Sequence, residues 1–339
     1  MLHYVASVYF TPLEPVCFRW FGVYTWMATG PSSQAVSELL PPPSTLAGAL
    51  ISGFAGALGK FNINPRGQAK SVDELLEDIR ELLKNAGCDC GQLALRGPYI
   101  YSEKGIALHV MGGKLALFGK DGVSVVSPGR VIARGVALRR DRGTVVKHIL
   151  YNIEYIDLRQ VLGDYSIVVD ILCEKQCSIK PNTTVVRFGS DGRITEMGIK
   201  LFENNLARMV MSRANGKGGS LAFVVSPILL DPALAEELIN AGGVRLGSFN
   251  IRSTSIGELK PYFKNVSESS LKDFRARIQM IAVGYDTMRN SLREMYPALM
   301  PGSIIYVDPI DVGVMLRGVG KYSSIGWGSI VPLESLIVQ

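Results

Sequence analysis

The spacing of apolar positions predicts a helix near the start of the chain, over residues 46–58. Its apolar stripe recurs at helical intervals and consists of Leu46, Ala49, Leu50, Gly53, Phe54, Ala57 and Leu58. The opposite side is small rather than charged, which is typical of a helix that is buried all round. Interior glycines such as Gly48 cost about 1 kcal/mol each relative to alanine, and are tolerated where another backbone packs closely.

The segment before this helix is Pro41-Pro42-Pro43-Ser44-Thr45, in which three prolines hold the chain extended. Ser44 or Thr45 then offers a hydroxyl that can cap the first backbone N–H groups. The start of such a helix also points N–H groups outward, where they can bind an anion such as a phosphate. A plain core helix with an ordinary cap explains the same residues, so this segment alone leaves both interpretations open.

The rest of the pattern alternates irregularly between strands and helices. Residues 71–85 are predicted to form an amphipathic helix with Ser71 as its cap, and residues 231–241 another helix that begins after Asp231. Strands are predicted at residues 2–10, 93–101, 106–110, 114–118, 123–126, 165–172, 221–229 and 275–285, although periodicity would also allow a helix in the last range. This mixture favours an α+β fold over a doubly wound parallel sheet.

The length of 339 residues suggests two domains more readily than one. A second body begins near Val161, so we expect one domain over residues 1–160 and another over residues 161–339. With 47% hydrophobic and 19% charged residues, the chain can bury large cores and is not disordered.

The charge balance adds little on its own. A formal net charge of +6 permits a nucleic-acid partner without requiring one. The first residues lack the basic region of a secretory signal, and residues 46–58 are too short to span a bilayer, which needs about 20 apolar residues. We therefore expect a cytoplasmic protein with no membrane partner.

The five cysteines do not have the spacing of a zinc site. Cys88-Asp89-Cys90 and Cys173 with Cys177 form two close pairs, and Cys17 stands alone. Buried thiols or an incidental disulfide explain them better than a metal does. A Cys173–Cys177 bridge is plausible in the cytosol of a thermophile.

A glycine-rich segment closes the chain, where Gly318, Gly320, Gly326 and Gly328 surround Lys321 and Trp327. Glycines let a backbone approach a ligand, and consecutive exposed N–H groups can form an anion-binding nest. The segment is not a phosphate-binding Walker loop, because Tyr322 follows Lys321 where serine or threonine is required. A glycine pattern by itself is weak evidence for a site.

The densest basic segment lies between residues 134 and 151. Its cationic side chains are Arg134, Arg139, Arg140, Arg142 and Lys147. A solvated loop would have this composition, and so would a hairpin that holds phosphates, because arginine binds phosphate in a bidentate manner.

Together these segments resemble the RAMP proteins of CRISPR systems. Residues 43–50 are similar to the early proline-serine-threonine helix motif of that superfamily, and residues 318–328 to its C-terminal glycine-rich loop. The order of the segments resembles subunit three of the type III-B (Cmr) effector. The segments that match loosely between these two motifs are residues 96–99, 134–151, 188–193, 284–286 and 301–306.

The resemblance implies two ferredoxin-like (RRM-like) domains in tandem, the first with inserted strands and the basic segment, the second with the glycine-rich loop. It also implies a non-catalytic subunit that binds the 5′ handle of the CRISPR RNA and joins the large cyclase subunit to the backbone RAMP subunit, without metal or cofactor. Splayed bases and phosphates of single-stranded RNA fit exposed N–H groups and cations, and Trp327 could stack on a base or lie in the core. The RNA-binding residues expected on this basis are Ser44, Thr45, Gly48, Arg134, Arg139, Arg140, Arg142, Lys147, Gly318, Gly320, Lys321, Gly326, Trp327 and Gly328.

Three alternatives stay open. Some RAMP proteins cleave CRISPR RNA with a histidine, and of His3, His109 and His148 only the last, which lies in the basic segment, is a serious candidate. The corresponding handle-binding subunits of type III-A or III-D effectors would share the fold. A single-strand RNA binder outside CRISPR is a further class, although the aromatic consensus of the RRM module is not found.

Overall fold

The computed structural model describes residues 2–19, 34–35, 37–57, 71–138, 145–180, 182–189, 192–213, 219–286 and 291–337. Helices and several antiparallel sheets are mixed along the chain, which confirms the predicted α+β class. Among the helices of the described ranges, none is long and apolar enough to cross a bilayer.

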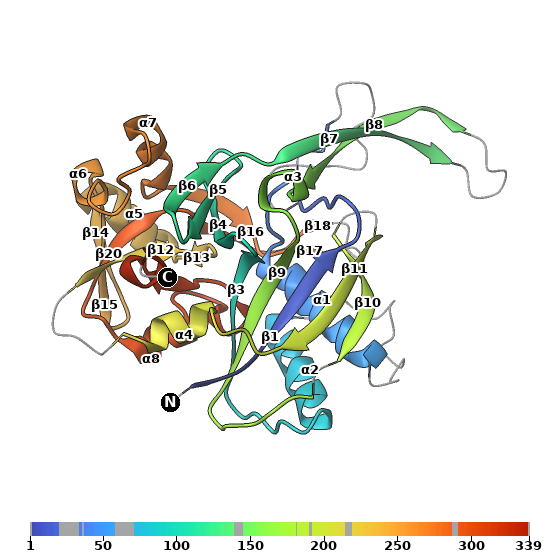
Figure 1. Ribbon diagram of the computed structural model, residues 1–339, viewed down its shortest axis with the longest axis horizontal. Coiled ribbons are helices and arrows are strands. Elements are labelled where there is room, and N and C mark those ends of the chain that lie inside the picture. Colours follow the sequence, from blue (N-terminus) through green and yellow to red (C-terminus); the bar gives the residue numbers. More distant parts are fainter. Residues whose placement is uncertain are drawn as a thin grey trace.

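The larger sheet has eight strands in the order β10-β11-β1-β9-β3-β4-β5-β6, with every neighbouring pair antiparallel. Figure 1 shows α1 (Pro43–Ala57) and α2 (Val72–Asn85) on one face of it. The strand β9 lies between β1 and β3, so β1, the helices and β3 form a split β-α-β unit. The bounds are β1 (His3–Pro12), β3 (Leu93–Ser102), β4 (Gly105–Val110), β5 (Lys114–Gly119), β6 (Gly122–Val126), β9 (Tyr165–Cys173), β10 (Thr183–Phe188) and β11 (Arg193–Lys200).

The second sheet has five strands in the order β14-β15-β20-β12-β21. Its chain order is β12, α5, β14, β15, β20, α8, β21, which places one helix after the first strand and one before the last. The bounds are β12 (Ser220–Val224), α5 (Pro232–Ala241), β14 (Gly243–Leu246), β15 (Phe249–Ser253), β20 (Ile304–Asp308), α8 (Val312–Arg317) and β21 (Ile330–Pro332).

Smaller elements complete the fold. The strands β7 (Gly129–Leu138) and β8 (Val145–Asp157) form a long arm that projects from the body, with β2 (Gln34–Ala35) paired to β8 (Figure 1). The other strands are β13 (Ile228–Leu229), β16 (Ile278–Ala282), β17 (Tyr285–Asp286), β18 (Ser291–Leu292) and β19 (Met295–Leu299). The short helices are α3 (Arg159–Leu162), α4 (Leu206–Met211), α6 (Ile256–Leu259), α7 (Glu268–Leu271), η2 (Lys272–Phe274), η3 (Ser323–Ile325) and α9 (Leu333–Ile337).

Two cores hold the sheets together. The first lies between α1, α2 and the large sheet, where Phe10 and Phe188 stack with ring centroids 4.7 Å apart. The second lies between the two sheets, where Phe118 of β5 meets Phe223 of β12 edge to face at 5.8 Å. The junction of the sheets is therefore packed, and it positions the pocket described below.

The division predicted at residues 160 and 161 does not follow the sheets. The strands β9, β10 and β11 all lie after residue 160 and belong to the large sheet. They complete the pairing of β1 on both of its edges, because β9 is hydrogen-bonded on one side and β11 on the other. The change from one sheet to the other falls between β11 and β12.

The predicted helix starts hold in two cases of three. Ser71 caps α2 with a complete capping box, and α5 begins at Pro232 after Asp231. In α1, however, the first residue is Pro43, so Ser44 and Thr45 lie inside the first turn rather than at the cap. The amide of Thr45 donates to the carbonyl of Pro42 at 2.9 Å. Proline suits the first helical position because it lacks an N–H group.

Two disulfides join the loop after α2 to the end of β9 and the residues that follow. They pair Cys88 with Cys177 and Cys90 with Cys173, with Cα atoms 5.3 and 5.6 Å apart. The Cys173–Cys177 bridge that the sequence made plausible is therefore not formed. Strand pairing explains the difference, because the register of β3 with β9 brings the residues just before β3 beside Cys173.

Candidate functional site

The start of α1 and the glycine-rich loop meet in the structure. The loop includes η3, which packs against β3 and α1. A Cβ atom built on Gly326 would lie 3.6 Å from the Cβ atom of Pro43 and 3.6 Å from the carbonyl oxygen of Gly97. Segments from opposite ends of the chain therefore form one region, as the sequence led us to expect.

The amides of this loop do not form the predicted anion nest. Main-chain carbonyls of the protein itself accept, at 2.8 to 3.2 Å, the N–H groups of Gly318, Lys321, Gly326 and Gly328. The glycines serve close packing instead: a Cβ atom on Gly328 would collide with the carbonyl oxygen of Val319, and one on Gly320 with that of Leu229. The prediction is wrong for these residues because the approaching backbone belongs to the same chain.

The side chains of the loop are also engaged. Trp327 is completely buried, so it cannot stack on a base and belongs to the core. The ammonium group of Lys321 lies 2.7 Å from the Asp231 carboxylate and 4.7 Å above the ring of Tyr296. Among the predicted loop residues only Gly320 is exposed, and Lys321 is half-buried.

A buried arginine on β3 holds the loop through hydrogen bonds to its main-chain carbonyls. Arg96 on β3 donates from Nε to the carbonyl of Leu316 and from Nη1 to that of Ser323, 3.0 Å away. Burial lowers the pKa of Arg96 to about 9, while the charge of Asp170 counteracts that effect. Asp170 accepts hydrogen bonds from Ser7 and Tyr99, and burial raises its pKa to about 6. This network is structural, since both charged groups are excluded from solvent.

An aromatic cluster that the sequence did not predict lies beside the loop. The hydroxyl group of Tyr322 donates to Glu294 at 3.0 Å, and its ring meets that of Tyr296 edge to face at 6.0 Å. Tyr322 is also the single non-glycine residue with positive φ among those described, at 55°. A tyrosine held in this conformation is a reason to suspect function. The only signal in the sequence is its position directly after Lys321.

The outer side of α1 carries small residues. Ser44, Gly48 and Ser52 follow one another at intervals of four residues; the last two are exposed and Ser44 is half-buried. No atom lies within 4 Å of a Cβ position built on Gly48. This glycine is therefore not explained by packing within the chain, unlike Gly53, whose Cβ position meets the side chain of Met197. Thr45 is half-buried beside Ser44.

The basic segment lies on the projecting arm. Arg134 is on β7 and Lys147 on β8, while Arg139, Arg140 and Arg142 lie outside the described residues. Figure 1 shows β7 and β8 extending away from the body in which α1 lies. The predicted cations of the arm and the start of α1 are therefore separate features of this structure.

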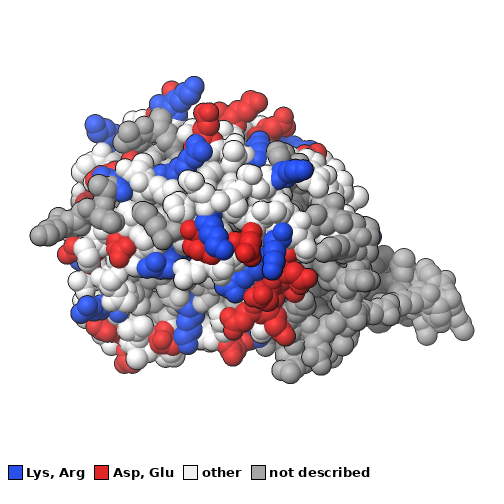
Figure 2. All heavy atoms as spheres, turned by 90° about the horizontal axis from the view of Figure 1, so that it is seen from below, with Lys and Arg blue, Asp and Glu red and all other residues white. Residues whose placement is uncertain are grey.

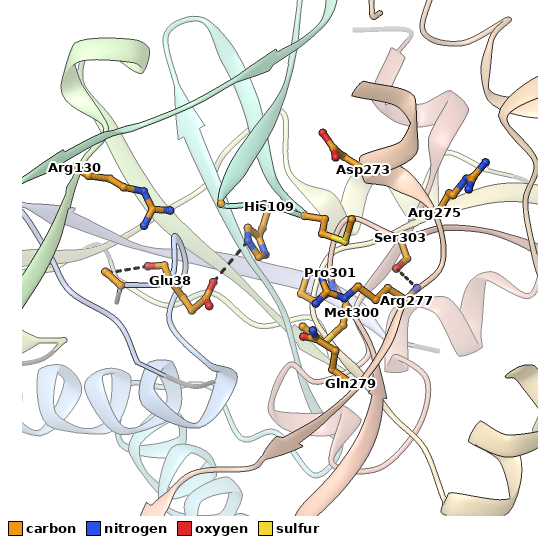
Figure 3. Close-up of a pocket in the computed structure, with 14 residues that line it drawn as sticks. Glu38, His109, Arg130, Asp273, Arg275, Arg277, Gln279, Met300, Pro301 and Ser303 are labelled. Atoms are coloured by element: carbon orange, nitrogen blue, oxygen red, sulfur yellow. Dashed lines mark hydrogen bonds and ion pairs between the residues drawn. The ribbon is translucent and has the colours of Figure 1, made fainter. Parts of the chain in front are cut away.

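A pocket at the junction of the two sheets is a second feature that the sequence did not predict. It has a volume of about 370 Å³. Figure 3 shows Glu38, His109 and Arg130 on one side and Arg277, Gln279 and Ser303 on the other. The first group comes from the segment before α1, from β4 and from β7. The second comes from the residue just before β16, from β16 and from the turn before β20.

The charges in this pocket are unevenly compensated. Arg130 forms an ion pair with Glu154, whereas Arg275 and Arg277 form none with any residue of the described ranges. Burial lowers the pKa of His109 to about 4, so its ring is neutral at neutral pH. Burial also raises the pKa of Glu38, against the opposing effect of Arg130.

The face of the body drawn in Figure 2 is not continuously basic. Figure 2 shows a face on which Lys and Arg alternate with Asp and Glu, and where acidic side chains gather in one area. The outward side of α2 is acidic, with Asp73, Glu74, Glu77 and Glu81 exposed. A polyanion would be repelled from that helix.

Comparisons with known proteins bear on the whole chain. No family model matches it. A curated protein named CRISPR system CMR subunit Cmr3, from Saccharolobus solfataricus, is 22% identical over 365 aligned residues, covering 98% of each chain. Chains in two cryo-EM structures of the type III-B Cmr-beta bound to cognate target RNA have the same fold. The chain from the structure that also contains AMPPnP has a TM-score of 0.55 and is 18% identical, with 98% of each chain covered. The chain from the other structure has a TM-score of 0.56 and is 20% identical, with 96% of each chain covered.

The resemblance to subunit three of the Cmr complex is confirmed. Because the match with Cmr3 extends over nearly the full length of both chains, it includes both sheets, the arm and the closing loop. Outside the closing loop, the individual RNA-binding residues stay predictions, since the comparisons name none of them.

Proposed function

We propose that this protein is a non-catalytic subunit of a type III-B (Cmr) CRISPR effector complex. In this proposal it binds the 5′ handle of the CRISPR RNA and joins the large cyclase subunit to the backbone RAMP subunit. The observation that carries the proposal is the end-to-end similarity to Cmr3 at 98% coverage of both chains. A cytoplasmic location and the absence of a cofactor belong to the same proposal.

We infer that the two sheets are the centres of two ferredoxin-like domains. Support comes from strand order: β12-α5-β15-β20-α8-β21 follows the β-α-β-β-α-β sequence of that fold, with β20 and β12 in the centre. In the large sheet β1, β3, β9 and β11 take the equivalent positions in the order β11-β1-β9-β3. The strands β4 to β6 and the arm are then insertions into the first domain.

The RNA-binding surface in this proposal is the start of α1 with the aromatic cluster beside it. Ser44, Thr45 and Gly48 present small groups that allow a sugar–phosphate backbone to approach closely. Tyr322 and Tyr296 supply aromatic faces of the kind on which bases stack. The cations of the arm would supply countercharge to a different part of the strand.

A processing ribonuclease is the alternative of another class. His148 lies on β8 in the projecting arm, and His109 is buried. General acid–base cleavage of RNA needs a proton acceptor within reach of the 2′-hydroxyl group. We therefore favour binding without cleavage.

The test is a binding titration of the full chain with CRISPR RNA that carries its 5′ handle, against an RNA of equal length with a scrambled handle. We expect tighter binding of the native handle. Raising salt from 50 to 200 mM should weaken it about tenfold if three or more phosphates are contacted. Equal affinity for both RNAs, no binding, or cleavage that is lost in His148→Ala would overturn the proposal.

A further inference from the structure

The pocket at the sheet junction contains an unsatisfied polar side chain. His109 is 6% exposed, and neither ring nitrogen has a hydrogen-bond partner among the described residues. The nearest charged group is the Glu38 carboxylate, whose Oε2 lies 3.9 Å from Nε2, which is too far for a hydrogen bond. Buried polar groups are nearly always paired, so this ring is arranged for a partner from outside the chain or for water.

The rim of the same pocket carries two arginines, and one of them, Arg277, donates from Nε to the side-chain amide oxygen of Gln279 at 3.0 Å. Arg275 and Arg277 are exposed and form no ion pair with a described residue. Their backbone is fixed, because the amide of Arg277 donates to the Ser303 hydroxyl group at 3.3 Å and its carbonyl accepts from Met300 at 2.8 Å. In the view of Figure 3 the side chain of Arg277, the residue just before β16, extends toward the side of the pocket that holds His109. An anion bound at the rim would therefore lie next to the neutral ring of His109, which offers one hydrogen-bond donor and one acceptor.

The dimensions and walls fit a nucleotide. The volume of about 370 Å³ is within the range of small-ligand pockets. Met111, Met300 and Pro301 supply apolar wall on the inner side. Thioether groups pack favourably against aromatic rings. A base could thus be held on its faces by these residues and on its edge by His109 and Glu38.

The pocket is also within reach of the surface proposed above. Gln279 lines the pocket, and Gly284, five residues further along the same extended segment, has a Cβ position 3.7 Å from the Ser44 hydroxyl oxygen. Five residues of strand span about 16 Å. A strand of a few nucleotides would therefore connect the start of α1 with the pocket.

We propose that this pocket receives a single splayed nucleotide of the bound RNA, with its phosphate at Arg275 and Arg277 and its base edge at His109. This inference rests on the proposed function, because it specifies how one nucleotide of the RNA is held. His109 acts here in recognition and not in catalysis.

The chemistry favours a nucleotide over an acidic segment of a protein partner. An aspartate or glutamate side chain could pair with Arg275 or Arg277, but it would approach the carboxylate of Glu38 and leave the two nitrogens of His109 unpaired. A base offers a donor and an acceptor side by side, and it fills the apolar wall as well. The protein partner is therefore the competing outcome of the experiment.

The experiment measures binding of the four 5′-ribonucleoside monophosphates and of handle-bearing RNA to the full chain by calorimetry. Arg277→Gln removes a rim cation from an exposed position and should not impair folding. Arg245→Gln is the matched control, because Arg245 is an exposed arginine on β14 that does not line the pocket. His109→Phe keeps the ring and removes both polar nitrogens.

We expect one equivalent of monophosphate to bind, with a preference among the four bases. Arg277→Gln should weaken monophosphate binding at least fivefold and RNA binding about three- to tenfold, while Arg245→Gln stays within twofold of the wild type. His109→Phe should abolish the base preference. If His109→Phe does not fold, the difference in monophosphate and RNA binding between Arg277→Gln and Arg245→Gln still tests the proposal.

The outcomes separate the two proposals. If RNA binds and both arginine variants behave alike, the pocket proposal is overturned and the proposed function stands. If no RNA binds but a monophosphate binds and Arg277→Gln weakens it, the proposed function fails, and the pocket is a site for a free nucleotide instead of a nucleotide of the RNA. Binding of an octaglutamate peptide that is lost in Arg277→Gln, without monophosphate binding, would assign the pocket to a protein partner.

Discussion

The glycine-rich loop and the pocket at the sheet junction differ in how their polar groups are used. In the loop, the amides of Gly318, Lys321, Gly326 and Gly328 all donate to carbonyls of the same chain. In the pocket, both nitrogens of His109 lack such partners among the described residues, and Arg275 and Arg277 lack a carboxylate. The sequence therefore indicates a binding site in the loop, whereas the structure shows unpaired polar groups in the pocket.

The difference teaches that a glycine pattern marks close backbone approach without saying whose backbone approaches. At Gly328 the close neighbour is Val319 of the same chain, so the glycine is a packing requirement. At Gly48 no atom of the described residues is within 4 Å of the Cβ position. Burial and hydrogen-bond satisfaction distinguish the two situations, and neither is visible in the sequence.

The largest effect is expected for Gly328→Ala. Gly328 has φ at +63°, and its new Cβ atom would collide with the Val319 carbonyl. The left-handed conformation costs about 1 kcal/mol and overpacking adds about 2, so the free energy of unfolding should fall by about 3 kcal/mol. Urea denaturation followed by circular dichroism measures it.

Gly247→Ala is the control for this variant. Gly247 has nearly the same φ, +61°, with nothing within 4 Å of its Cβ position. It should lose only about 1 kcal/mol, the conformational part of the effect. Equal losses in the two variants would show that Gly328 is not confined by Val319, and the comparison of loop and pocket would break down.

A smaller effect is expected from protonation in the pocket. The pKa of His109 falls from 6.5 to about 4 on folding, so the unfolded chain takes up this proton first as the pH is lowered. Stability from this group is present above pH 6.5 and is lost between pH 6.5 and 4. Between pH 7 and pH 5 the loss is about 2 kcal/mol.

His109→Gln removes this titration and keeps a polar side chain. The measurement is the difference in unfolding free energy between the variant and the wild type at pH 7 and pH 5. On going from pH 7 to pH 5, the unfolding free energy of the variant should rise by about 2 kcal/mol relative to that of the wild type. Glu38 and Asp170 are present in both proteins, so their contributions to the pH dependence largely cancel. Parallel pH profiles would show that the ring is solvated and the pocket open to water.

The sequence predicted the fold class and most elements, because those depend on local patterns. The amphipathic stripe and the cap at Ser71 are visible without any tertiary contact, and α2 begins where they indicate. The grouping of strands into sheets was not accessible in this way. It depends on pairings between distant segments, such as β1 with β11, which moved the sheet boundary from residue 160 to beyond Lys200.

The site was predictable only in outline. The meeting of α1 with the closing loop followed from the resemblance to RAMP proteins, whereas the role of individual residues did not. Trp327 is fully buried, and a tryptophan next to glycines has the same sequence whether it faces the core or solvent. His109 was set aside because it lies in a strand, and only the junction with the second sheet places Arg277 opposite it.

The smallest effect is expected for Gly48→Ala, and it has the opposite sign to that of Gly328→Ala. Gly48 is exposed in the second turn of α1 with open space around it. Alanine is favoured over glycine in a helix interior by about 1 kcal/mol, so the variant should be more stable by that amount. If RNA approaches this face of α1, the added methyl group should also weaken binding of handle-bearing RNA several-fold.

Ser52→Ala is the matched control, because Ser52 is exposed one turn further along the same face. It should gain about half as much stability and leave RNA binding unchanged. Loss of stability in Gly48→Ala would mean that the helix surface is covered within the free protein. Unchanged RNA binding in both variants would remove Gly48 from the interface and leave the aromatic cluster of Tyr296 and Tyr322 as the part of that surface to be tested.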